Sequence, residues 1–527
     1  MIRSFFASAI FSAGILSLAQ PAFAQGADKP LGVVHFETSC NLEAQKLFDN
    51  AMLYQHSFWY SASQGLFRDA LKADPRCAIA DWGIAMSLLW NPHLAPPPKN
   101  LAQGSAVLAE AKAIGAGTER ERDYIAALTI MYANNETVDH NTRMQAYTKA
   151  MEQLAARYPG DDEAQIYYAL ALNTSANPAD KTYANQLKGA AILEPIAKRQ
   201  PLHPGVAHYL IHLYDYPPLA AKGLEAARRY AKLAPAASHA QHMPAHIFTR
   251  LGYWRESIAS NIEAEKAGKA AGEGDDELHA MDYLVYAYLQ LGEDAHAKAV
   301  LDEMNIVAGA SGTFVPSYAL AAAPARYAVE RADWKSAAIL EVHADAAPNV
   351  QALTYFARAL GSARLGHADA AKTEIAKLTA LRDQLRAAKD AYWAEQVDIQ
   401  QQVATAWMLD AQGKRANALN AMRAAADAED GTEKHPVTPG AGKPARELYG
   451  VMLLKHGKPG DALIAFETTL KTLPNRLGAM EGAAMAAEKS GDAAKAKDYY
   501  GKIVAMADHP DKSRTELADA RDYLAKH

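Results

Sequence analysis

Segments of about 34 to 40 residues recur along this chain, and each has the pattern of two short helices closed by a proline. In the clearest early unit, Leu47, Ala51 and Tyr54 fall on one face of a first helix, and Phe67 and Ala70 mark a second. Small residues let paired helices approach closely, while larger ones fill the groove between pairs. The period therefore predicts an all-α array of stacked helical hairpins.

A complete unit stands near the C-terminus, in the string PARELYGVMLLKHGKPGDALIAFETTLKTLPNR, residues 444–476. Its small residues, tyrosine, phenylalanine and terminal proline resemble the tetratricopeptide repeat (TPR) family at the corresponding offsets. The resemblance covers most of the chain and weakens between residues 102 and 202. It implies a helix-turn-helix repeat solenoid wound into a right-handed superhelix, with a concave groove in which family members bind proteins or peptides.

Breaks in the helical pattern of the sequence predict the domain boundaries. Residues 25–428 are expected to form an N-terminal repeat array, residues 429–443 a loop or linker, and residues 444–527 a C-terminal set of repeats. Long ordered loops in helical arrays are often functional. An interaction or gating loop that uses Glu433 and His435 is one interpretation of this segment, and a solvated linker is the favoured one.

The N-terminus has the pattern of a secretory signal peptide. Arg3 precedes an apolar run from Phe5 to Leu18, and Ala22-Phe23-Ala24 supplies a small-x-small cleavage site. We expect residues 1–24 to be removed after Ala24 and the mature protein to be periplasmic or secreted. An uncleaved membrane anchor is the alternative. No later stretch is long and apolar enough to predict a membrane span.

Cys40 and Cys77 are the chain's only cysteines. Export places them in an oxidising compartment, which favours a disulfide between them. A metal site built on both thiolates is the competing interpretation, but neither cysteine has a partner at CxxC spacing.

Histidines form a stripe across three consecutive predicted helices, and seven of the chain's 18 histidines lie between His203 and His279. The first helix is expected to start at Pro204 and the second at His239, after a capping box of Ser238 and Gln241. Within each helix the histidines recur at spacings of three or four, which places them on one face. The resulting candidate ligands are His208, His212, His239, His242, His246, His279 and the carboxylate Asp282.

An internal offset supports this register. Leu291-Gly292 lies forty residues after Leu251-Gly252, and the same offset maps His239 onto His279 and His242 onto Asp282. Packed helices lie about 8–10 Å apart, so histidines on neighbouring helices are expected to converge on one ion. Pro244 should kink the middle helix, because it has no amide hydrogen to donate.

Imidazole-rich sites suit transition metals. Copper and zinc are favoured here, and iron is a further candidate. Residues expected to orient the ligands or a substrate are Asp215, Glu277, Tyr209, Tyr286 and His435. For each tyrosine, ordinary packing within the repeats is the favoured alternative.

Two functions follow from the sequence. The first is an exported repeat protein whose groove holds a histidine-rich metal site, with catalysis left open; the second is a non-catalytic scaffold for a protein or peptide. The strings HYLIH and SHAQHMPAHIF resemble an exported bacterial subgroup of TPR proteins, which implies the fold and no reaction. The formal net charge of -6 gives no basic stripe, so nucleic-acid binding is not expected.

Overall fold

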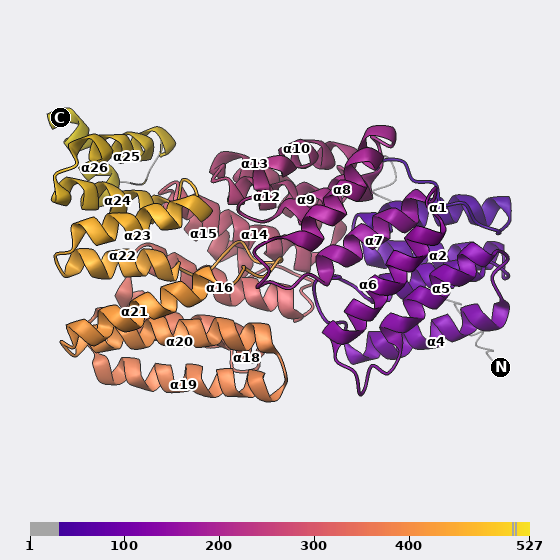
Figure 1. The fold of residues 1–527 in the computed structure, drawn as a ribbon, viewed down its shortest axis with the longest axis horizontal. Coiled ribbons are helices and arrows are strands. Elements are labelled where there is room, and N and C mark those ends of the chain that lie inside the picture. Colours follow the sequence, from indigo (N-terminus) through magenta and orange to yellow (C-terminus); the bar gives the residue numbers. More distant parts are fainter. Residues whose placement is uncertain (1–30, 508–510, 512–513) are drawn as a thin grey trace, which may run out of the picture.

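The computed structural model describes residues 31–507, 511 and 514–527. Within these residues the regular structure is entirely helical and no strand occurs, which confirms the all-α prediction. The expected signal peptide, residues 1–24, lies outside the described residues. Helices adjacent in sequence pack as neighbours joined by short connections, and the chain runs from one end of the molecule to the other (Figure 1).

Thirteen α-helices and a short 3-10 helix cover the described residues up to Ala271. Their bounds are α1 Leu42–His56, α2 Tyr60–Ala73, α3 Ala78–Leu88, α4 Pro98–Ile114, α5 Glu119–Tyr132, α6 His140–Arg157, α7 Asp162–Thr174, α8 Ala184–Arg199, α9 Pro204–Tyr214, η2 Ala220–Gly223, α10 Leu224–Leu233, α11 Ser238–His242, α12 Pro244–Arg250 and α13 Trp254–Ala271.

The remaining helices follow from Gly274 to the C-terminus. Their bounds are α14 Gly274–Gln290, α15 Asp294–Met304, α16 Phe314–Glu330, α17 Trp334–Ala338, α18 Pro348–Arg364, α19 Ala368–Ala387, α20 Ala391–Ala411, α21 Arg415–Asp430, α22 Ala445–Lys455, α23 Pro459–Thr472, α24 Leu477–Ser490, α25 Ala493–Met506 and α26 Thr515–Lys526.

The core is built where helices pack along the array. One apolar cluster extends from Leu31 to Phe248 and a second from Ala325 to Met452. The second cluster includes Ala426 of α21 and Ala445 of α22, so one core continues across the loop that the sequence marks as a linker. The loop begins after Asp430 and is an insertion between two helices that pack against each other.

The helix is interrupted before Pro244, while Met243 keeps helical backbone angles of φ -55° and ψ -35°; a kink in the helix axis stays a prediction. The helical segment divides into α11 and α12 at Met243, and Pro244 occupies the first turn of α12. The capping box predicted from Ser238 and Gln241 is wrong. The Ser238 hydroxyl instead donates to the Ala264 carbonyl of α13 at 2.8 Å, since α11 already begins at Ser238 itself.

The predicted disulfide is confirmed, because Cys40 and Cys77 are bonded with their Cα atoms 4.9 Å apart. The bridge closes a segment with a sequence separation of 37. In the chain-entropy view such a cross-link destabilises the unfolded state by about 2–4 kcal/mol. We expect the double variant Cys40→Ser/Cys77→Ser to unfold at lower denaturant concentration, as followed by circular dichroism. An unchanged midpoint would show that the bridge contributes nothing to stability.

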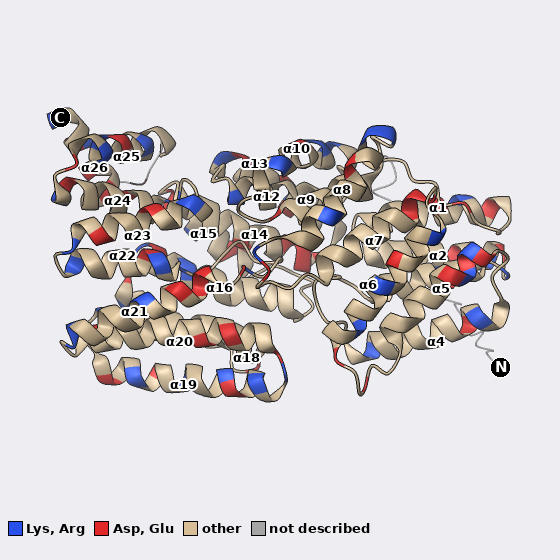
Figure 2. Cartoon of the chain, viewed as in Figure 1, with Lys and Arg blue, Asp and Glu red and all other residues tan. Residues whose placement is uncertain are grey.

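Charged side chains of both signs are interspersed along the helices, so charge does not single out one face (Figure 2). Among the helices of the described residues, none is both long enough and apolar enough to cross a membrane.

Candidate metal centre

Six histidines from α9, α11, α12 and α14 meet in the interior in two groups of three. The sequence predicts their convergence on one ion, and the structure instead separates them into two sites. One group comprises His208, His212 and His239; the other comprises His242, His246 and His279. In each group the possible ligand atoms all lie within 4.8 Å of one another. His239 is half-buried, and the other five side chains are buried.

Local sequence explains why α9 presents its histidines inward. Pro204 occupies the first helical position, as predicted, and the His203 ring caps the helix by accepting the Val206 amide. Gly205 faces the His56 ring so closely that a Cβ there would collide with it. This close approach lets the His56 carbonyl accept the Nδ1–H of His208 at 2.7 Å.

The first group is arranged around His208. Its Nε2 lies 3.0 Å from Nε2 of His212 and 3.0 Å from Nε2 of His239. Because Nδ1 carries the proton that it donates to the His56 carbonyl, Nε2 of neutral His208 has only a lone pair. One lone pair cannot serve two well-aligned donors. Three ring nitrogens at this spacing match the edge of a tetrahedral site, since Zn–N bonds of about 2.0–2.1 Å place ligand nitrogens roughly 3.3 Å apart.

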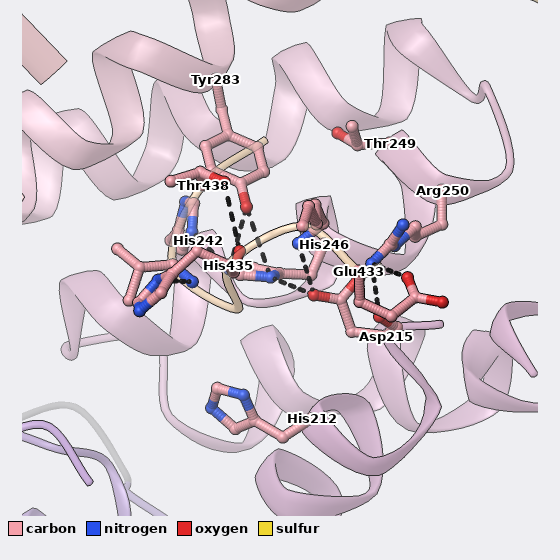
Figure 3. Close-up of polar contacts among 12 residues, drawn as sticks. His212, Asp215, His242, His246, Thr249, Arg250, Tyr283, Glu433, His435 and Thr438 are labelled. Atoms are coloured by element: carbon pink, nitrogen blue, oxygen red, sulfur yellow. Dashed lines mark hydrogen bonds and ion pairs between the residues drawn. The ribbon is translucent and has the colours of Figure 1, made fainter. Parts of the chain in front are cut away.

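The second group presents lone pairs to each other more directly (Figure 3). His242 Nδ1 donates to Asn261 Oδ1 at 2.7 Å, and His246 Nδ1 donates to Asp215 Oδ2 at 2.9 Å. These partner oxygens accept only, so both Nε2 atoms are unprotonated in the neutral rings, yet they lie 2.9 Å apart. Two facing lone pairs repel unless a cation lies between them. A metal ion bound between them, with His279 as third ligand, would supply that cation.

Burial keeps these imidazoles neutral and therefore able to ligate. Desolvation lowers the pKa of His208 and of His279 to about 3, and it lowers the pKa of His242 well below its usual value. For His246, burial lowers the pKa although Asp215 opposes the effect. At neutral pH each ring has a lone pair for a metal.

The two groups are neighbours. The His212 and His246 ring centroids lie 6.1 Å apart, and those of His239 and His242 lie 6.2 Å apart. Within the first group, the His212 and His239 centroids are 6.3 Å apart. Rings of different groups therefore lie as close to each other as rings of the same group, so two ions bound here would be neighbours.

Asp215 is the predicted orienting carboxylate that the structure places at the centre. Besides His246, it accepts Nε of Arg250 at 2.9 Å and Nζ of Lys434 at 2.9 Å. Burial alone would raise the pKa of Asp215, but Lys434, Arg250 and His246 outweigh it and hold the pKa below its ordinary value. The carboxylate stays ionised and fixes the His246 ring, as carboxylates commonly do for metal-ligating histidines.

The loop between α21 and α22 packs onto this centre, so its interpretation as a solvated linker is wrong. Four of its polar side chains are buried, those of Thr432, Glu433, His435 and Thr438. Lys434 donates to Asp215, a residue 219 positions earlier in the chain. His435, predicted as an orienting residue, stacks on Trp393 with ring centroids 5.2 Å apart. The charged side chains of the loop are paired in the fold, Lys434 with Asp215 at 2.9 Å and Glu433 with Lys181 at 2.8 Å.

Other predicted residues lie outside the two groups. Asp282 belongs to neither and pairs with the buried Arg326, although the forty-residue offset placed it among the ligands. Tyr286 accepts from Arg476 at 3.0 Å, and the Tyr209 hydroxyl is 3.0 Å from His56 Nδ1. Burial raises the pKa of Glu277, which is in neither group.

A third cluster, His56, Glu163 and His203, has its hydrogen bonds satisfied. Glu163 accepts from His203 Nε2 at 2.9 Å and lies 3.0 Å from His56 Nε2. His203 Nδ1 accepts the Val206 amide, and His56 Nδ1 has the Tyr209 hydroxyl. Every ring nitrogen has a partner, so no lone pair remains to require a metal. This cluster supports the His56 carbonyl that holds His208.

Sequence analysis missed Asn261, Lys434 and Phe58. The Phe58 ring packs on the first group, with its centroid 4.3 Å from that of His208 and 5.1 Å from that of His239. Its backbone has a φ of 57°, a left-handed conformation that costs a bulky residue about 1–3 kcal/mol and often occurs at functional sites. Only tertiary packing brings these residues to the site, and no spacing in the sequence indicates it.

No protein-family model and no curated protein matches the chain. Solved structures similar to it include yeast Tom70, at 10% identity over 92% of this chain and 96% of that chain with a TM-score of 0.34. The P58(IPK) TPR domain is 12% identical over 92% and 99% of the chains, with a TM-score of 0.20. The human IFIT1 dimer with m7Gppp-AAAA is 11% identical over 89% and 98%, with a TM-score of 0.35. Such distant likeness carries no conclusion about function.

Proposed function

We propose that this protein is an exported helical-repeat metalloprotein that binds two transition-metal ions, one in each histidine group. The observation that carries the proposal is the 2.9 Å approach of two imidazole nitrogens whose protons are both committed elsewhere, on His242 and His246. In the first group, the unprotonated Nε2 of His208 lies 3.0 Å from Nε2 of both His212 and His239, although its single lone pair suits one donor. Both groups therefore contain a nitrogen contact that an ion would satisfy better than hydrogen bonding alone.

The ligand atoms limit which metals suit the site. The ligands are imidazoles without thiolate, which suits copper or zinc and, after them, iron. Three histidines leave one position of a tetrahedral ion open, as in catalytic zinc sites that activate water. The proposed chemistry is activation of a small molecule at that open position. Export through residues 1–24 gives the compartment, and the intact mass of the mature protein should correspond to a chain that begins at Gln25.

Elemental analysis of untagged mature protein tests the proposal. We expect about two equivalents of copper or zinc per chain, and not the three that the His56 cluster would add. Ion binding to the folded state raises the melting temperature, so chelation should lower it and metal should restore it. Less than about a tenth of an equivalent, with no thermal shift on adding either metal, would refute the proposal.

The scaffold remains the second candidate function, because one cavity favours it. Lys434 and His435 line a cavity of 320 Å³ that also has the aromatic walls Tyr392, Trp393 and Phe356. A peptide side chain fits such a space. Under this alternative the histidines serve packing, and substitution of Trp393 rather than of His242 should abolish partner capture.

A further inference from the structure

His93 approaches both histidine groups from the loop between α3 and α4. The Asn91 side chain accepts the His93 amide at 3.0 Å, which fixes the local turn. The His93 ring then lies against His212, with centroids 4.6 Å apart. Electrostatic interactions join it to His246 of the second group as well.

The inward nitrogen of this ring has no partner. His93 Nε2 is buried and makes no hydrogen bond with any described residue. The rings around it are better satisfied, since His208, His242 and His246 all donate from Nδ1. A buried polar nitrogen without a partner destabilises the fold unless something binds it. Its position beside His212 indicates that the partner belongs to the metal centre.

His93 does not extend the ligand set itself. It is a member of neither group whose ligand atoms all lie within 4.8 Å of one another. A molecule in the open fourth position of the first ion would be bonded to the metal. A side chain that hydrogen-bonds this molecule would lie outside the set of metal ligands. His93 contacts His212 without belonging to the group, which suits this role.

Resting on the two-ion function proposed above, we propose that His93 hydrogen-bonds, through Nε2, a small oxygen ligand on the ion of His208, His212 and His239. The ligand class is hydroxide or dioxygen itself. A neutral imidazole donates one N–H or accepts one hydrogen bond without adding charge. His93 is thus a residue that binds the exogenous ligand, and the three histidines bind the metal.

Azide, a small anion that occupies open copper positions, serves as the probe. Copper-loaded mature protein is titrated with azide and followed by the copper–azide absorption band and by calorimetry. We expect His93→Ala to retain two copper ions and to bind azide at least about tenfold more weakly, as loss of a hydrogen bond to a charged acceptor predicts. His93→Gln, which keeps an N–H donor, should recover part of the affinity.

His343→Ala is the matched control, since His343 is an exposed histidine outside both groups. It should leave copper content and azide affinity unchanged. Equal azide affinity in the His93→Ala variant and the unaltered protein would overturn the inference. Loss of one copper from His93→Ala would also overturn it, by making His93 a ligand. Failure of the unaltered protein to bind either copper or zinc would instead refute the proposed function, so the two failures are distinguishable.

Discussion

Replacing Asp215 with asparagine is expected to destabilise the protein by about 3–5 kcal/mol, the usual cost of removing one partner from a buried ion pair. Arg250 and Lys434 would face a neutral amide in place of the carboxylate that each contacts at 2.9 Å, and both cations would stay buried beside each other. The Asp215 side chain is only 4% exposed, so solvent cannot take its place. Denaturant unfolding followed by circular dichroism measures the loss.

The same substitution should weaken the second ion. The new amide side chain would still reach His246, but without a charge to orient and polarise its ring, and loss of such a partner typically costs about 10–100-fold in metal affinity. The first group should keep its ion, since the His56 carbonyl holds His208 independently. Asp302→Asn, in an exposed pair with Lys298, should leave both quantities unchanged. An Asp215→Asn variant as stable as the unaltered protein would show that the charges rearrange freely.

Removing one ligand from either group is expected to halve the metal content. His239→Ala should release the ion of the first group and His279→Ala that of the second, because each leaves two imidazoles where three are needed. Each single variant should hold about one equivalent and the double variant none. The measurement is elemental analysis after dialysis against metal-free buffer.

Helical content serves as the control for the His239→Ala and His279→Ala variants. His279 is buried and His239 is half-buried, so circular dichroism must show the helical content unchanged before metal is counted. Retention of two equivalents by both variants would place the ions elsewhere. Loss of both ions from either variant would indicate one shared site instead of two.

Helical periodicity was sufficient to predict the hairpin array, because it depends on local patterns. Pro204 and Pro244 were located correctly for the same reason: a missing amide hydrogen limits a helix wherever it stands. The six histidines of the stripe do come together in the fold, since spacings of three and four put side chains on one face. The division of the stripe into two groups falls within α11, where His239 belongs to the first group and His242 to the second, and their spacing does not specify this.

The pairing of Asp282 could not be predicted from the register of the repeats. The forty-residue offset aligned it with His242, but the carboxylate turns to Arg326, a residue of α16. Lys434 and Phe58 belong to segments far away in sequence. Lys434 contacts Asp215 and Phe58 contacts His208, and these contacts place both residues at the site. Pair choices among buried charges follow from the whole fold, and the local sequence does not contain them.

The reach of Lys434 to Asp215 has a consequence for how the protein matures. The chain emerges from the ribosome and from any export channel in order, and these two residues are separated by 219 positions. The first group needs only residues up to His239, whereas the second receives its last charged partner when the loop after α21 arrives. Under the proposed function, the residues of the two sites would therefore become available one after the other, those of the first site before those of the second.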